Sequence, residues 1–173
     1  MTAQIIFGQS DAVARELVTA LNDASTANLF CLSLTAETVY ARKMNVTDIP
    51  KTGEPVNVQV FPGHDAADRV GISGIYDDVY GVHVLLQQHV ADAPETQVPL
   101  LMLLRSQIAK FLCSKALTCP EGTVVDPFER AHVVAHRHGN EGVYDLGRLE
   151  ALNVFYSDMI VTYRAAGLRR RTG

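Results

Sequence analysis

Apolar residues near the start of the chain recur with the spacing of one helical face. Ser10 and Asp11 precede them. Both suit a helix N-terminus, because serine accepts a hydrogen bond from a free amide and aspartate is favoured at the positive end of the helix dipole. The apolar stripe consists of Val13, Leu17, Ala20 and Leu21. This pattern predicts a helix of about three turns that ends in the polar residues following Leu21.

Alternation with a period of two replaces the helical spacing from Leu29 onward and predicts a long strand over residues 29–40 with one polar face. A loop rich in proline follows over residues 47–55. A short strand is then predicted over residues 56–63, where valine occupies every second position. The next segment, 63–74, is polar and rich in glycine, which is typical of a turn or a surface excursion.

A further strand is predicted over residues 76–90, and its apolar residues on both faces indicate a central place in the sheet. A second helix is expected to begin near Gln97, with Pro99 tolerated in its first turn. Its main apolar stripe consists of Leu101, Leu104, Ile108, Phe111 and Leu112. Additional apolar residues widen this surface, so we expect a second partner for the helix, either the first helix or a neighbouring subunit.

The last third of the chain predicts a strand over residues 128–137, a loop over 137–147 and a closing strand within 149–164. In the closing strand, Phe155, Met159, Val161 and Tyr163 lie on one face, opposite Asp158 and Thr162. The element order predicts one α+β domain over residues 1–173: a mainly antiparallel, possibly mixed, sheet of four to five strands with two helices packed on one face. Residues 167–173 form a short basic tail.

Composition favours a soluble, unsecreted globular protein. The chain has 173 residues, a net charge of −4 and 47% hydrophobic against 20% charged residues, so there is no overall attraction to nucleic acid. The N-terminus lacks the pattern of a signal peptide, and the longest apolar run, residues 98–104, is too short to span a bilayer. The three cysteines have no C-x-x-C spacing, which favours reduced thiols over a disulfide framework or a structural zinc site.

Three histidines, His132, His136 and His138, form the densest group of potential metal ligands. On a helix, His132 and His136 would be one turn apart and could share a zinc ion. The surrounding residues favour a strand, in which these two lie about 13 Å apart at about 3.3 Å per residue, too far for common ligation. We therefore expect an exposed or interfacial sheet face here, and no metal.

An adjacent His64 and Asp65, followed by Asp68, could support acid–base or metal chemistry. We expect them in a loop, with no evident third ligand. A small metal-dependent hydrolase that uses this pair and the downstream histidines is the alternative from the enzyme class. Residues 71–74 depart from the G-x-S-x-G pattern, and neither a P-loop nor a G-x-G-x-x-G motif occurs. We expect no catalytic residues and no cofactor.

Three segments together carry a family resemblance: VNVQVFPG at 56–63, DDVYGVHVLLQQ at 77–88 and LEALNVFYSDMIVTYR at 149–164. With the preceding helix and long strand and the apolar helix between them, their order resembles the tail terminator, or tail-completion, proteins of long-tailed bacteriophages. The resemblance spans roughly residues 10–165 and rests on the order and patterning of elements.

The resemblance implies a structural virion protein, assembled in the cytoplasm of the bacterial host, that caps the head-proximal end of a tail tube as a ring, commonly a hexamer. Implied partners are further copies of the chain, the tail tube protein and the head–tail connector or neck proteins, with possible passing contact with genomic DNA and none with a membrane. It implies no catalysis and no cofactor. A neck or head-completion protein is the close alternative within this class.

Two groups of residues are candidates for contacts. The first comes from the second helix and the segment after the short strand: Leu100, Met102, Leu103, His64, Asp65 and Arg69. The second is the basic run Arg169, Arg170 and Arg171, which could contact DNA phosphates or an acidic partner. A solvated tail is the alternative for this run.

Overall fold

The computed structural model describes residues 9–40, 48–70, 75–90, 94–120, 122, 124–127, 132–133 and 143–170; for 64–70, 75–78, 132–133 and 166–170 it describes the backbone. The elements in chain order are α1 (Gln9–Thr26), β1 (Leu34–Thr38), β2 (Val56–Val70), β3 (Ile75–His89), α2 (Pro94–Leu112), β4 (Leu117–Thr118), β5 (Val124–Pro127), β6 (His132–Val133), α3 (Leu146–Leu152) and β7 (Val154–Arg170).

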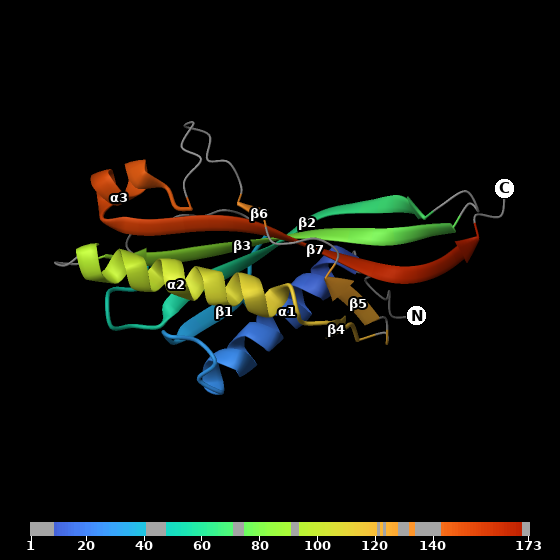
Figure 1. The fold of residues 1–173 in the computed structure, drawn as a ribbon, viewed down its shortest axis with the longest axis horizontal. Helices are drawn as coiled ribbons and strands as arrows, with labels where there is room; N and C mark the ends of the chain where they lie inside the picture. Colours follow the sequence, from blue (N-terminus) through green and yellow to red (C-terminus); the bar gives the residue numbers. More distant parts are fainter. Residues whose placement is uncertain are drawn as a thin grey trace, which may run out of the picture.

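One sheet contains all the described strands, in the order β1-β2-β3-β7-β5-β4, with β6 also paired to β7 (Figure 1). β1 and β2 are parallel, and the other pairs are antiparallel. The α+β class and the mixed, mainly antiparallel sheet are confirmed. The sheet has more strands than the expected four to five, because the short β4 and β5 lie where no strand was predicted; β5 pairs with β7, and β4 pairs with β5.

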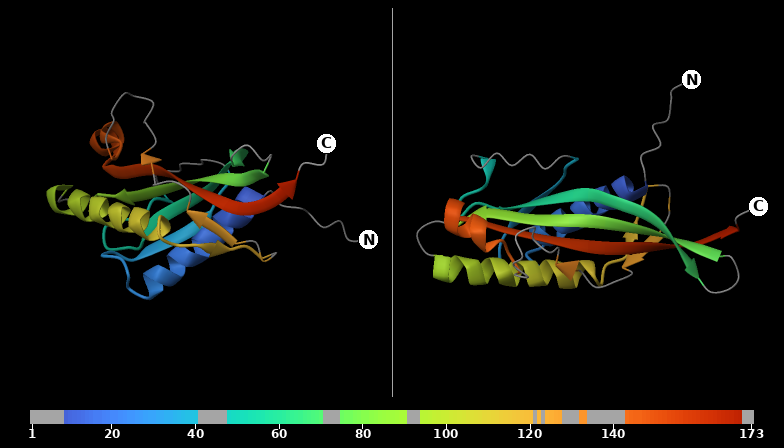
Figure 2. Two further views of the ribbon diagram at one scale, coloured as in Figure 1. Left: turned by 45° about the vertical axis from the view of Figure 1, so that its right-hand side comes forward. Right: turned by 90° about the horizontal axis from the view of Figure 1, so that it is seen from above.

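Helices α1 and α2 lie on the same face of the sheet, whereas α3 lies at one end of the other face (Figures 1 and 2). The packing of two helices on one face is therefore confirmed. Alternate residues of the central strands meet the helix stripes in a single core. Its most buried members include Leu17, Leu21, Val58, Val84, Leu104, Ile108, Met159 and Tyr163. Burial of these side chains is the main source of stability, at about 25 cal/mol per Å² of apolar surface.

Helix α1 is longer than predicted, since it continues through the polar residues that were expected to end it. The side chain of Asn22 donates to Ala36 O at 3.0 Å and accepts from Ala36 N at 2.8 Å. Ser25 exchanges a similar pair of hydrogen bonds with Leu34. These polar side chains thus join the helix to β1 instead of terminating it.

Strand β1 is shorter than the predicted strand over 29–40. It pairs with β2 only from Leu34 to Thr38, opposite Val56 to Val60. Before it, the backbone bends toward α2, where Cys31 N donates to Gln107 Oε1 at 2.8 Å. Alternation of apolar residues thus continues beyond the part of the chain that has a strand partner.

Strand β2 is longer than the predicted 56–63, so the prediction of a turn or excursion over 63–74 is wrong for residues 64–70. The strand passes an irregularity between Pro62 and Asp65 and then pairs with β3 as far as Val70. Gly63 permits this course, because a Cβ atom there would lie 2.4 Å from Gly81 O. Residues 71–74, with the rejected G-x-S-x-G resemblance, lie outside the described residues.

Strand β3 agrees closely with the predicted strand over 76–90, and its central place between β2 and β7 is confirmed. Helix α2 begins at Pro94, earlier than the predicted start near Gln97, so Pro99 lies inside the helix and not in its first turn. Among the described residues, no helix is long and apolar enough to cross a membrane.

The C-terminal part differs most from prediction. Helix α3 occupies residues assigned to a loop and to the start of the closing strand. Asp145 caps it by accepting a hydrogen bond from Arg148 N, and Asn153 ends it in the left-handed conformation. β7 then runs to Arg170, which includes part of the expected basic tail. Of the predicted strand over 128–137, the described residues are the two of β6.

Candidate functional site

Three strands extend beyond the two large helices and form an arm, defined here as residues 66–70 of β2, 75–78 of β3 and 166–170 of β7. Figures 1 and 2 show these strand ends projecting past α1 and α2 at one end of the molecule. Continuous pairing holds the arm together: Val70 pairs with Ile75, and Ile75 pairs with Arg170. The longest strands of the sheet thus project from the body as one ribbon.

Both outer strands of the arm have open edges within the described part of the chain. β1 covers β2 only as far as Val60, and β5 covers β7 only from Tyr163 to Ala165. Beyond these points, described strands pair with β2 and β7 only through β3. An open strand edge presents backbone donors and acceptors that another strand can use.

The arm brings together two groups that are far apart in the sequence. Arg69 on β2 pairs with Tyr76 on β3, which pairs with Arg169 on β7, so the three residues form one row across the arm. Arg170 occupies the adjacent row. Asp65 lies nearer the body, opposite Tyr80, and His64 lies in the irregularity beside it. Arg171 lies outside the described residues.

The candidate residues of α2 separate into two kinds. Leu100 and Leu103 are 44% and 48% exposed, whereas Met102 is partly buried and packs against the core. Leu29 is 60% exposed in the segment that crosses α2, where the Cys31 thiol donates to Leu100 O at 3.7 Å. Burial is the main cause that raises the pKa of Cys31. The exposed apolar surface of α2 is therefore provided by Leu100 and Leu103.

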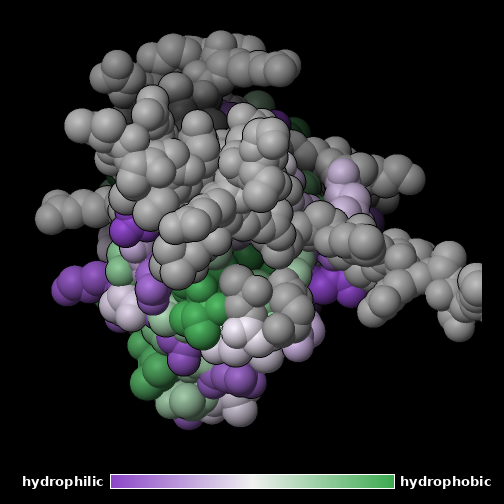
Figure 3. Space-filling view, turned by 90° about the vertical axis from the view of Figure 1, so that its right-hand side faces the viewer, coloured by the Kyte–Doolittle hydropathy of each residue, from purple (hydrophilic) through white to green (hydrophobic). Residues whose placement is uncertain are grey.

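A groove of about 430 Å³ lies between the second half of α1 and the end of α2. Ala20, Ala24 and Phe111 contribute apolar lining, and Glu16, Asp23 and Lys115 add charged groups. Figure 3 views the body from the arm end; there the visible hydrophobic surface is divided into small areas by hydrophilic residues. Apolar surface that could meet a partner is thus distributed over several places.

The sheet face opposite α1 and α2 carries a row of polar side chains. Gln87 Nε2 donates to Gln59 Oε1 at 3.1 Å, and Gln59 Nε2 donates to Glu37 Oε1 at 3.4 Å. Nearby, His83 Nδ1 lies 3.5 Å from Asp158 Oδ1, and the Asp158 side chain is 2% exposed. A small apolar cluster of Phe61, Leu85 and Tyr156 interrupts these groups.

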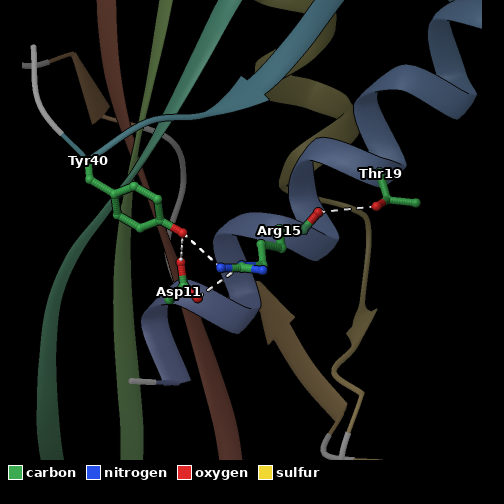
Figure 4. A network of polar contacts seen from close by, with 4 residues as sticks. All are labelled: Asp11, Arg15, Thr19 and Tyr40. Carbon is green, nitrogen blue, oxygen red and sulfur yellow. Dashed lines mark hydrogen bonds and ion pairs between the residues drawn. The ribbon is translucent and has the colours of Figure 1, made fainter. Parts of the chain in front are cut away.

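A surface network joins the start of α1 to the end of β1 (Figure 4). Tyr40 Oη donates to Asp11 Oδ1 at 2.6 Å, while Arg15 donates to both Tyr40 Oη and Asp11 Oδ2. The hydrogen bond with Tyr40, together with the charge of Asp11, raises the pKa of Arg15. The network therefore connects the first turns of α1 to the segment that follows β1.

Residues considered for enzyme chemistry are not gathered into one described site. The backbones of His64 and Asp65 lie on β2, and that of His132 lies on β6 at the opposite side of β7. His136 and His138 lie outside the described residues. Within the part of the chain that the structure describes, no group of three or more His, Cys, Asp or Glu could hold a metal ion.

Comparison with known proteins assigns no family to this chain. No protein-family model matches it, and no curated protein matches it.

Proposed function

We propose that this protein is a structural virion component that caps the head-proximal end of a phage tail tube as a ring and forms the joint to the head connector. The arm is the observation that carries this proposal, because it places open strand edges well away from the body. An open strand edge can pair with a strand of a neighbouring copy, and the family resemblance of the sequence points to the same role.

Ring closure follows from a head-to-tail contact. When one surface of a subunit binds a different surface of the next, a rotation that divides the circle evenly closes the assembly. The open edges of β2 and β7 in the arm can accept a strand from a neighbour through backbone hydrogen bonds. Leu100 and Leu103 on α2 provide apolar area for a second contact, with a neighbouring subunit or the tail tube protein.

The row of Arg69, Tyr76 and Arg169, next to Arg170, places three arginines at the arm end, and Asp68 and Asp77 pair in the next row toward the body. We assign it to an acidic surface of a connector protein or to the DNA that passes through the joint. Such contacts weaken as salt is raised, because the interaction of exposed charges is screened over about 8 Å at physiological ionic strength.

An arm-shortened variant tests the proposal directly. Replacing residues 66–79 with Asn-Gly joins Asp65 to Tyr80, which are paired neighbours in the sheet, by a two-residue turn. The body should retain its fold, seen as an unchanged pattern of core methyl resonances. In electron micrographs of tail tubes mixed with purified protein, the wild type should form a ring at one tube end and the variant should not.

The double variant Leu100→Ser/Leu103→Ser provides a second test of the proposed function. Ser106→Ala, on the same helix, is its matched control. The double variant should reduce ring formation, whereas the control should not. Rings formed equally by the arm-shortened variant, or no association of wild-type protein with any tube end, would contradict the proposed function.

A further inference from the structure

Arg105 is a charged residue in the otherwise apolar interior between α2 and the sheet. It is 8% exposed, and its Nε donates to Ser157 Oγ at 2.9 Å. Ser157, on β7, is fully buried and donates in turn to Val143 O at 2.5 Å. One short chain of hydrogen bonds thus links α2, β7 and the segment that precedes α3.

The guanidinium group has more donors than this chain uses. Arginine carries five N–H donors, and the hydrogen bond to Ser157 uses the one on Nε. No carboxylate of the described residues forms an ion pair with Arg105. The residue as a whole is 8% exposed, so part of it remains in contact with solvent.

Two other arginines of the body are paired with acids. Arg15 lies 3.0 Å from Asp11, and Arg148 lies 3.4 Å from Asp145. For Arg105, burial lowers the pKa, and within the described part of the chain no acidic group acts in the opposite direction. Since an arginine remains protonated far above neutral pH, Arg105 is buried as a cation, and this burial destabilises the folded state.

A purely structural role does not explain this residue. The hydrogen bond to Ser157 requires one donor, which a neutral side chain could supply without the cost of a buried charge. An anion that binds to the terminal nitrogens would offset the cost of burying this positive charge. Carboxylates fit the planar fork of a guanidinium through two parallel hydrogen bonds, and such pairs are among the strongest in proteins.

We propose that the terminal nitrogens of Arg105 form a binding site for one carboxylate group at the junction of α2, β7 and residues 143–145. Met102 and Ala109 flank Arg105 on the same side of α2, and Tyr144 adjoins the linked Val143; all three are partly buried and pack against the core. These apolar neighbours limit screening and strengthen the ion pair. This inference does not depend on the proposed function.

One positive charge matches a monoanion better than a phosphate dianion. The carboxylate could come from an Asp or Glu side chain of a partner protein or from a small free carboxylic acid. Both present the same group to Arg105, so the site is assigned by its chemistry and the experiment distinguishes the two sources.

Acetate and acetamide provide a matched pair of probes, because they have nearly the same shape and only acetate is charged. The full chain, labelled with ¹⁵N and with ¹³C-methyl methionine, is titrated with each at constant ionic strength. Acetate should produce saturable shifts of the Arg105 Nε–H and Met102 methyl resonances, and acetamide should not. Arg105→Met should abolish the Met102 shift, whereas Lys110→Met, a control on the exposed face of the same helix, should retain it.

Equal responses to acetate and acetamide, or no response of Arg105 at any acetate concentration, would overturn the proposal. A stronger response to inorganic phosphate than to acetate would also overturn the assignment to carboxylate. The urea midpoint of Arg105→Met adds an independent readout: it should equal or exceed that of the wild type, because an unpaired buried charge is removed. A large fall in the midpoint together with no acetate response would mean that the residue has only a structural role.

The source of the carboxylate is separated by two further measurements. N-acetylglutamate amide, which mimics a side chain within a protein, should bind only weakly if the natural ligand is part of a partner surface. A small dicarboxylic or hydroxy acid that binds at least about 100-fold more tightly than acetate, equivalent to about 2.7 kcal/mol, would identify a free acid as the ligand.

Discussion

The two faces of the central sheet use the same strands in different ways. On the face covered by α1 and α2, successive strands contribute apolar side chains such as Val58, Val84 and Met159, all fully buried. On the opposite face, polar Gln59 and Asp158 lie in the same row as Leu85. Stability thus depends mainly on the helix-covered face, whereas the opposite face adds hydrogen bonds whose net contribution is smaller.

The largest effect is expected on the helix-covered face. Leu104→Ala should lower the free energy of unfolding by about 3 kcal/mol, because Leu104 is fully buried and its truncation leaves a cavity. Leu103→Ala is the matched control. Leu103 is adjacent in the sequence but 48% exposed, so its truncation should change stability little. Urea denaturation followed by circular dichroism measures both. Equal losses for the two variants would contradict the difference in burial.

A backbone contact in the body, just before the arm begins, should give the next largest effect. Gly63→Ala places a methyl group 2.4 Å from Gly81 O, so the strands must shift apart at a cost of about 2 kcal/mol. At Gly147, an added Cβ would lie 3.4 Å from Asp145 Oδ1, an ordinary contact, and Gly147→Ala should be tolerated. The thermal midpoints of the two variants test this ordering. A Gly63→Ala protein as stable as the wild type would show that β2 and β3 are not held together here.

Tyr163 makes stability of the helix-covered face sensitive to alkaline pH. Burial, with a smaller contribution from Cys113, raises the pKa of Tyr163 well above its usual value of about 10. The unfolded chain therefore loses this proton before the folded chain does, and the stabilising contribution declines as pH rises above about 10, by up to about 1.4 kcal/mol per pH unit. Tyr163→Phe should flatten this decline in urea midpoints measured at increasing pH. An identical pH dependence in the two proteins would assign the decline to other groups.

The smallest effect is expected on the opposite face. Gln87→Met keeps most of the side-chain volume but removes the hydrogen bond to Gln59, so the free energy of unfolding should fall by about 1 kcal/mol. Thr35→Ala, an exposed position in the same row, is the control and should have little effect. A loss comparable to that of Leu104→Ala would remove the distinction between the two faces.

Local pattern predicts the body well and the arm poorly. Val56, Val58 and Val60 alternate along the chain because their side chains are buried on one face of the sheet. This alternation correctly predicts the start of β2. Residues 64–70 carry no such pattern. They form a strand because β3 lies beside them, and a pairing partner cannot be recognised from the composition of one segment.

The candidate residues follow the same division. Exposure of Leu100 and Leu103 is readable from an excess of apolar residues on one helix. The sequence did not reveal that Met102 is partly buried and packs against the core. The prediction overlooked Arg105, although a single arginine in an apolar helix was a visible signal. It also missed α3, whose signal was Asp145 followed by a short apolar repeat that Gly147 obscured.

The sequence by itself determined the α+β class, the apolar faces of α1, α2, β3 and β7, and the approximate places where most of these elements begin. These depend on the burial of side chains at regular spacing along the chain. Only the tertiary structure decided the strand order, the length of the arm, the row that joins Arg69 to Arg169 and the burial of Arg105 beside Ser157. Each of these depends on contacts between residues far apart in the sequence, whose partners become defined only when the strands pair in register and the helices pack.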